Sequence, residues 1–281
     1  MKCGAIIFPT EETIHPARLA RELEARGFES LFVPEHTHIP VERRSPYPGG
    51  GDLPREYWRT YDPFVALSQA AAVTERLRVG TGICLVTERD PLVLAKEVAS
   101  LDALSGGRFL FGIGAGWNAE EMENHGTAFA DRWSVLRDRV LAMKALWTTD
   151  ESRYHGRHAD FAPVVSLPKP HQRPHPPILI GAFSARAYRR IAEYGDGWIP
   201  IFLATSLEQE IPVFRRVLEE AGRDPDSATI SVFGAPSREA DLERLRALGV
   251  DRAIIQLPHA EEGRVLAKLD RCAPLVERFH D

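Results

Sequence analysis

Eight apolar, β-rich segments alternate with helical patterns along the 281 residues, and this alternation restricts the possible folds more than any other feature. The strand-like segments are 4–8, 30–34, 77–86, 108–114, 177–181, 197–201, 229–233 and 252–257. Regular alternation predicts parallel strands covered by helices, and eight such units in roughly 250 residues fit a closed (β/α)8 TIM barrel. A doubly wound open sheet is the alternative, because alternation does not show whether the sheet closes.

Two stretches interrupt the alternation. A loop rich in Pro, Gly and Arg follows the second strand-like segment as far as Thr60, and an irregular region dense in Pro and His spans 148–177. No linker or shift in composition divides the chain, so we expect a single domain over 1–281 with insertions after strand two and before strand five.

The composition is that of an ordinary globular protein, with 44% hydrophobic residues and a net charge of −5. This charge gives no support to nucleic-acid binding. Three distant cysteines fit a reducing compartment better than a disulfide framework. The N-terminal apolar run is too short for a signal peptide and no run approaches the ~20 residues of a membrane span, so we expect a cytoplasmic protein.

The predicted C-terminal strand ends, where TIM barrels place their working residues, hold glycines and small residues in place of nucleophiles. Such ends favour a large, flat cofactor approached closely by the backbone. His36 and His38 form a His-x-His pair that a barrel hydrolase would use for metal. The later strand ends lack the further ligands, so a structural or hydrogen-bonding role is favoured for both histidines and no metal site is expected.

The segment FGIGAGWN, 111–118, places three glycines at alternate positions after an apolar run. A dinucleotide fingerprint needs its third glycine at another spacing and belongs to the first strand–helix unit. These glycines follow the fourth strand, and a loop of about a dozen residues is expected before the next helix. We interpret them as strand four entering the barrel mouth and leaving room for a tricyclic ring.

Five motifs together resemble the luciferase-like monooxygenase superfamily, and within it the deazaflavin-dependent oxidoreductases that use coenzyme F420. The likeness extends to about residue 201. The motifs are SLFVPEHTHIP, DPFVAL, LRVGTGICLVTERDPLVLAKEVASLDALSGGRFLFGIGAGWNAEEM, PPILIGAFS and YGDGWIP.

The resemblance implies a TIM barrel with a deazaflavin, or FMN in the alternative, across its C-terminal mouth. It implies a strand-three bulge at Gly82-Ile83, often with a cis peptide, against one face of the ring, and a phosphate held after strand five. It also implies a homodimer acting on a small-molecule substrate. The implied cofactor-binding residues are His36, Thr81, Gly82, Ile83, Gly114, Gly116, Gly181, Ala182, Phe183 and Ser184.

One position departs from the family. The sugar-phosphate dehydrogenases of the family carry a proton-donating glutamate after the strand-four glycines, where this chain has Trp117. We expect catalysis to involve His36, Trp117 and Glu120, with Trp117 as a wall on the substrate side. Glu120, Glu121 and His36 are the candidates for the acid.

We therefore expect an oxidoreductase that transfers a hydride between coenzyme F420 and a small organic substrate. The alternative in the same fold is an FMN-dependent monooxygenase. Two further hypotheses are a metal-dependent barrel hydrolase and a flavin-binding protein without turnover.

Overall fold

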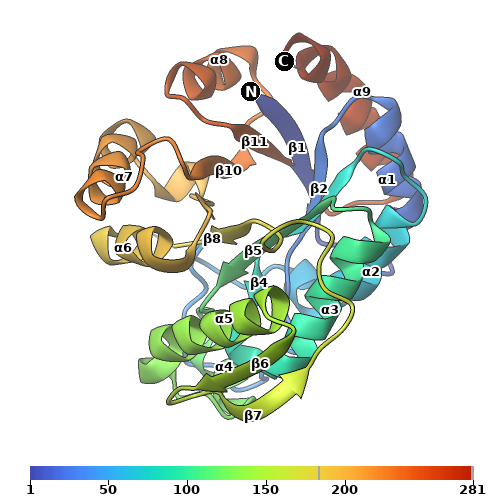
Figure 1. Cartoon of the computed structure of the whole chain (residues 1–281). Coiled ribbons are helices and arrows are strands. Elements are labelled where there is room, and N and C mark those ends of the chain that lie inside the picture. The colour runs from blue at the N-terminus through green and yellow to red at the C-terminus, as the bar shows by residue number, and fades with distance from the viewer. Residues whose placement is uncertain (183, 280–281) are drawn as a thin grey trace.

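The computed structural model of the protein describes residues 1–182 and 184–279, and its parallel strands close into a barrel surrounded by helices (Figure 1). The barrel strands are β1 (Lys2–Ile6), β2 (Ser30–Val33), β3 (Arg78–Thr81), β4 (Cys84–Leu85), β5 (Phe109–Gly114), β8 (Ile178–Ile180), β9 (Gly197–Trp198), β10 (Thr229–Ala235) and β11 (Arg252–Gln256).

The order of the strands is β3-β2-β1-β11-β10-β9-β8-β5-β4, and parallel pairing of β3 with β5 closes the sheet. Val79 pairs with Phe109 and Gly80 with Leu110 at this closure. β3 and β4 are two parts of one barrel strand, interrupted at Gly82-Ile83, so the closed barrel has eight strands. The predicted (β/α)8 barrel is confirmed, and the open-sheet alternative is wrong.

Helices α1 to α9 follow the strands and cover the barrel. They are α1 (Pro16–Ala25), α2 (Pro63–Ala71), α3 (Pro91–Leu104), α4 (Ala119–Asn124), α5 (Arg132–Thr148), α6 (Ala185–Tyr194), α7 (Leu207–Glu220), α8 (Glu239–Ala247) and α9 (Glu262–Phe279). The Asp-Pro pairs start two of them, since Asp62 accepts a hydrogen bond from the Val65 amide and Asp90 from those of Leu92 and Val93.

Two apolar cores hold the layers together. The larger lies between strands and helices, while the smaller fills the barrel itself, as is typical of TIM barrels. The barrel filling consists of Ile6, Phe32, Leu110, Leu179, Ile199 and Ile254. Ile83 and Phe233 pack on this filling and are only partly buried, because they form its upper surface toward the barrel mouth.

The two insertions lie where the sequence predicts them, but one has more structure than expected. The loop after β2 contains a short 3-10 helix, Arg55–Trp58. The region expected to be irregular begins with an antiparallel hairpin of β6 (Glu151–His155) and β7 (Asp160–Val165), which lies beside α5 (Figure 1). Asp138 of α5 anchors this hairpin by accepting hydrogen bonds from the Tyr154 hydroxyl and the His158 amide.

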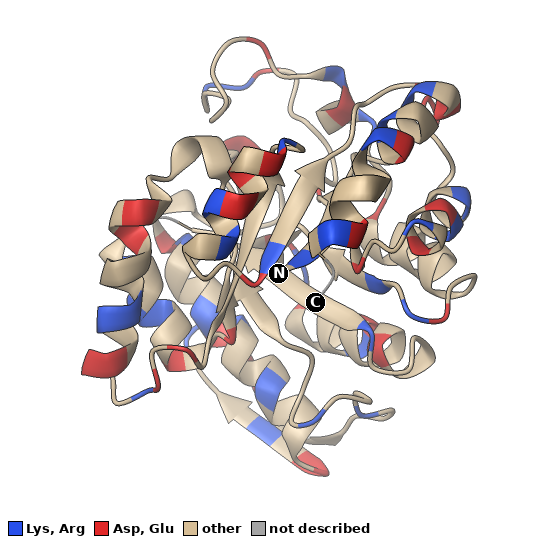
Figure 2. Cartoon of the chain, turned by 90° about the horizontal axis from the view of Figure 1, so that it is seen from above, with Lys and Arg blue, Asp and Glu red and all other residues tan. Residues whose placement is uncertain are grey.

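Charged residues belong mainly to the helices and outer loops, with both signs interspersed, whereas most of the barrel strands carry none (Figure 2). No helix in the described part of the chain is long and apolar enough to cross a membrane.

Candidate functional site

A cavity opens at the C-terminal ends of the barrel strands, where the sequence predicts the site. Every barrel strand from β1 to β10 ends beside it, and its walls are mainly apolar and aromatic. The lining residues are Phe8, Pro34, Glu35, His36, Tyr57, Gly82, Ile83, Leu85, Gly116, Trp117, Gly181, Ile199, Ile201 and Phe233.

His36 is the cavity's imidazole, and a buried carboxylate holds its ring. Its Nδ1 lies 2.7 Å from Oε2 of Glu121, and the side chains are 6% and 0% exposed, respectively. With Glu121 ionised, Nδ1 donates the hydrogen bond and Nε2 is left for the cavity. Nε2 has no hydrogen-bond partner in the described part of the chain.

Glu121 is itself fixed by the backbone around it. Its Oε1 accepts a hydrogen bond of 3.0 Å from the Thr37 amide, and Asn118 Nδ2 lies 3.4 Å from Oε2. Glu121 lies on α4, within the segment that the sequence analysis treats as a loop. This short helix brings the carboxylate from the strand-four side of the mouth to His36 on the strand-two side.

The expected bulge of the third barrel strand is present between β3 and β4. The peptide between Gly82 and Ile83 is cis, and the Gly82 amide donates a 2.8 Å hydrogen bond to the Val33 carbonyl. Gly82 and Ile83 line the cavity. Thr81 is fully buried, and its hydroxyl donates to the Gly112 carbonyl at 2.6 Å, so it ties the bulge to β5 from below.

The strand-four glycines make room mainly for this bulge, which differs from the expectation that they accommodate a ring directly. A Cβ at Gly112 would lie 2.0 Å from the Thr81 carbonyl oxygen, and one at Gly114 would lie 2.6 Å from Cδ1 of Ile83. Gly116, with φ of +79°, does line the cavity. The chain therefore needs the first two glycines to seat the bulge and the third at the cavity wall.

Aromatic rings form the wall next to His36. The Trp117 ring stands edge-on to His36 with 5.7 Å between centroids, and Tyr57 lies 5.3 Å from His36 on another side. Tyr47 packs against both Trp117 and Tyr57. Trp117 thus lines the cavity, and its role as a wall on the substrate side remains a prediction. The sequence analysis missed Tyr57, because the long loop after β2 gives no pattern that would direct it into the cavity.

Glu120 does not line the cavity. Its carboxylate accepts hydrogen bonds from the Arg44 and Ser45 amides at 3.0 and 3.3 Å and from Arg44 Nε. Partial burial opposes ionisation of Glu120, but these hydrogen bonds outweigh it and lower its pKa to about 2. The geometry therefore favours Glu121 over Glu120 as the carboxyl group acting near His36.

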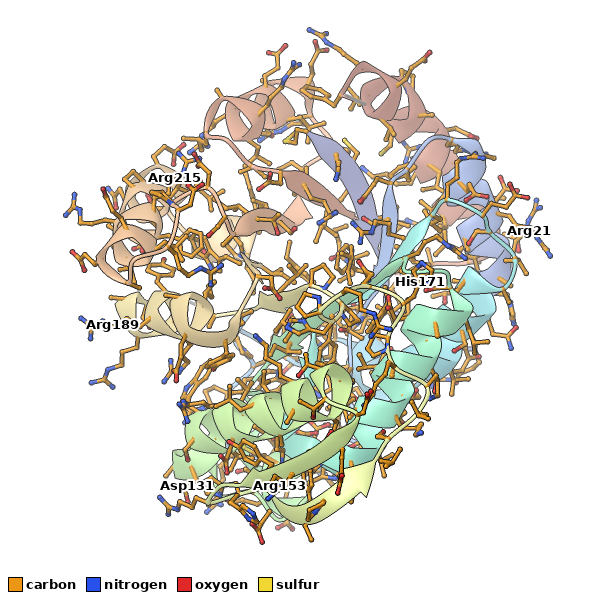
Figure 3. All side chains as sticks on the ribbon, viewed as in Figure 1. Arg21, Asp131, Arg153, His171, Arg189 and Arg215 are labelled. Carbon is orange, nitrogen blue, oxygen red and sulfur yellow. The ribbon has the colours of Figure 1, made fainter. Side chains whose placement is uncertain are left out.

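The segment after β8 lies at the same mouth. Gly181 lines the cavity, and the buried Ala182 accepts a 2.9 Å hydrogen bond from the Trp198 indole. Phe183 lies outside the described residues. Ser184 precedes α6 as its N-cap with φ of 147°, and the Ala187 amide donates to its hydroxyl. Arg189 of α6 points away from the barrel into solvent (Figure 3).

His36 and His38 point to different partners. His38 lies 2.9 Å from the Thr37 hydroxyl and 2.9 Å from Asn124 Nδ2, whereas His36 contacts Glu121. A search of the described residues finds no group of three or more His, Cys, Asp or Glu side chains arranged to hold a metal ion.

Glu88 is a further buried carboxyl group near Glu121 that the sequence analysis does not identify. It follows β4 in a short 3-10 helix, Val86–Glu88, and its side chain is 1% exposed. Tertiary packing, including contacts of this turn with α5 and β5, buries it, and a single Glu in a Thr-Glu-Arg-Asp segment gives no sign of that packing.

Comparisons with known proteins agree with this fold. The model of the family described as luciferase-like monooxygenase matches residues 10–272. An uncharacterized protein of Mycobacterium tuberculosis is 39% identical over 279 residues, which cover 97% of this chain and 98% of the relative.

Three solved structures share the fold at low sequence identity. Monooxygenase RslO1 from Streptomyces bottropensis has a TM-score of 0.83 at 21% identity, covering 100% of both chains. An F420-dependent secondary alcohol dehydrogenase in complex with an F420-acetone adduct has a TM-score of 0.78 at 16% identity, again over 100% of both chains. The FMN-bound oxygenating constituent of 3,6-diketocamphane monooxygenase from Pseudomonas putida has a TM-score of 0.66 at 20% identity, over 87% of this chain and 70% of that one.

Proposed function

The chain belongs to the luciferase-like monooxygenase family, and on this premise we propose that it is an oxidoreductase that transfers a hydride between coenzyme F420 and a small organic substrate. One observation carries the proposal. A buried carboxylate orients a single imidazole at the edge of an apolar cavity whose floor is the Gly82-Ile83 bulge. Such a cavity offers a proton-exchanging group and a dry surface, and leaves the redox chemistry to a bound cofactor.

The lining residues fit a flat ring system. Ile83, Ile199 and Phe233 present apolar surface, and Gly82 and Gly181 add no side chain to it. A Cβ at Gly181 would already lie 3.0 Å from Cγ2 of Ile83, so a larger residue there would fill part of the cavity. A deazaflavin bound here would supply hydride transfer at its C5 carbon.

The chain's own residues supply the proton chemistry and the exclusion of water. His36 presents Nε2 to the cavity, where it can take a proton from a substrate hydroxyl or return one to a carbonyl oxygen. Glu121 keeps the ring in one orientation. Trp117 and Tyr57 line the same space with aromatic surface, which suits an uncharged organic substrate and helps to exclude water once it is bound.

The phosphate of the cofactor would be held after β8. Gly181, Ala182 and Ser184 lead into the N-terminus of α6, where the amide groups of the first turn that Ser184 does not cap would be available to an anion. In the loop after β2, Arg44, Arg55 and Arg59 are engaged with Glu120, Glu12 and Glu11, respectively. Lys169 donates to the Leu146 and Thr149 carbonyls, away from the cavity. The backbone after β8 is therefore the better candidate for holding the phosphate.

FMN-dependent monooxygenation is the second candidate, supported by the two solved monooxygenases that share the fold. The two activities differ in their need for oxygen. We expect the protein with reduced coenzyme F420 to reduce small ketones without oxygen and to form the oxidised cofactor in equal amount. Oxygen consumption that requires reduced FMN, with no anaerobic turnover of coenzyme F420, would favour the monooxygenase instead.

We also propose a homodimer, as the resemblance implies, and a cytoplasmic location.

A further inference from the structure

Glu88 carries a buried oxygen without a partner directly behind the His36–Glu121 pair. Its side chain is 1% exposed, and Oε2 has no hydrogen-bond partner in the described part of the chain. The other oxygen faces Gly116 on the cavity wall, where a Cβ would lie 3.5 Å from Oε1. An ionised carboxylate in this position would lose its hydration without compensation.

The charged groups around Glu88 come from each element packed against it. Burial is the largest influence on the pKa of Glu88 and raises it. The negative charges of Glu121 on α4 and of Glu35 after β2 raise the same pKa further. Glu121 is near enough that sharing a proton with it also favours the protonated form of Glu88. Arg89 opposes them, but its guanidinium is engaged by Glu35, Asp62 and Glu97. Together these influences raise the pKa of Glu88 to about 9.

Glu88 has one neighbour on its cavity side and another on its solvent side. Toward the cavity, Glu88 adjoins Glu121, whose Oε2 lies 2.7 Å from Nδ1 of His36. Toward solvent, Nε2 of His125 lies 3.9 Å from Oε2 of Glu88, and the His125 side chain is 28% exposed. The Thr37 hydroxyl, 2.7 Å from the same nitrogen of His125, helps to hold that ring in place.

We propose that Glu88 is a positioning residue that stores a proton and passes it between Glu121 and His125, so that His36 exchanges protons with solvent through the protein interior while substrate and cofactor occupy the cavity. The proposal rests on the proposed function, which gives His36 a proton to exchange.

The transfer is balanced and moves no electrons. Nε2 of His36 takes the proton of a substrate hydroxyl, and Nδ1 gives its own proton to Glu121. Glu121 passes a proton to Glu88 while Glu88 releases one to His125, and His125 gives a proton to water. One proton enters at Nε2 of His36 and one leaves at His125. Each carboxyl group returns to its starting state, and His36 ends with its proton on Nε2 until the reverse transfer restores the Nδ1 proton. Reduction of a carbonyl runs the same sequence backward.

A test without cofactor or substrate separates this inference from the proposed function. Infrared spectra of the purified protein with 13C-labelled glutamate would report protonated carboxyl groups, and 15N-imidazole NMR would follow His36. Glu88→Gln keeps the shape of the side chain but cannot release a proton in this range. Glu123→Gln is the matched control, because Glu123 is an exposed carboxylate on α4, the helix that carries Glu121.

At pH 7 we expect a protonated-carboxyl band in the wild type and E123Q that is lost in E88Q. The 15N chemical shifts of the His36 ring should show an inflection near pH 9, where Glu88 loses its proton, in the wild type and in E123Q. E88Q should show no such inflection. Exchange of the Nδ1 proton with water should slow in E88Q and in His125→Gln. A purely structural carboxyl group would produce neither the inflection nor the slower exchange.

The proposal is overturned if E88Q retains the band, or if the His36 titration and proton exchange are the same in all variants. If E88Q does not fold, the infrared spectrum of the wild type still tests the proposal. The absence of a protonated-carboxyl band at pH 7 would overturn the proposal.

Discussion

His36 is the residue on which the proposed chemistry depends most, because it is the cavity imidazole with an unengaged nitrogen. Replacing it by asparagine should lower kcat about 100-fold or more, since a positioned acid–base group contributes roughly 10²–10⁴ in rate. The dissociation constant of the cofactor should change little. Stopped-flow kinetics and binding titrations would measure the two effects separately.

His38→Asn is the matched control for this variant. His38 contacts Thr37 and Asn124 and is not among the cavity-lining residues, so its replacement should leave kcat near the wild-type value. Wild-type turnover in the His36 variant would show that the proton comes from elsewhere.

Glu88 should give the protein a distinctive dependence of stability on pH. Its pKa is raised in the folded state, so between the unfolded pKa and about 9 the folded protein binds more protons than the unfolded one. The contribution to the free energy of unfolding is complete below the unfolded pKa and is lost as the pH rises through the folded one. Urea unfolding at pH 5, 7 and 9 should therefore show E88Q gaining stability relative to the wild type. A difference independent of pH would contradict the raised pKa.

At this scale the sequence analysis predicts the positions of His36 and Trp117, because each follows a recognisable strand, whereas the bulge at Gly82-Ile83 is implied by the family resemblance. It leaves the acid open among His36, Glu120 and Glu121, but it names Glu120 and not Glu121 among the catalytic residues, and the geometry favours Glu121. Glu120 and Glu121 are neighbours on a six-residue helix, α4, and only its packing turns one toward His36 and the other toward Arg44. Side-chain direction on so short a helix is set by tertiary contacts, not by spacing.

Among the elements, the bulge between β3 and β4 and the adjoining strand β5 form one unit. Gly112→Ala should destabilise the protein by about 3 kcal/mol, because its Cβ would lie 2.0 Å from a backbone oxygen that cannot move independently of β3. The same change should weaken cofactor binding by displacing Gly82 and Ile83. Thermal unfolding and a cofactor titration would test both effects.

Gly263→Ala serves as the control, because Gly263 lies in the first turn of α9 and a Cβ there would meet only the end of the Glu261 side chain, at 3.1 Å. It should be neutral or slightly stabilising. Equal stability of the two alanine variants would show that β5 tolerates a side chain at Gly112.

The missed hairpin shows which elements a sequence pattern fails to predict. The buried barrel strands are continuous apolar runs, whereas β6 and β7 are mostly exposed and lack a clear alternation. Pro163 lies within β7 and argues locally against a strand. Contacts with α5 stabilise this hairpin, and those contacts are not visible in its own sequence.

For the whole molecule, the number and order of strand–helix units predict the barrel, while its closure depends on the pairing of β3 with β5.

The homodimeric assembly remains a prediction. Val65 on α2 and Val93 on α3 are 63% and 57% exposed, and these two helices lie in contact. Light scattering at micromolar concentration should give twice the chain mass of 31.4 kDa. A single-chain mass would contradict the expected homodimer.

Binding of the cofactor tests the central claim most directly. Purified protein should be titrated with coenzyme F420 and separately with FMN, following the absorbance and fluorescence of each, and the titration should be repeated with Gly181→Leu. We predict saturable binding of one coenzyme F420 per chain, weaker binding of FMN, and loss of binding in the Gly181 variant, whose side chain would occupy the cavity beside Ile83. Failure of the wild type to bind either cofactor, or equal binding by the Gly181 variant, would contradict the proposed site and its function.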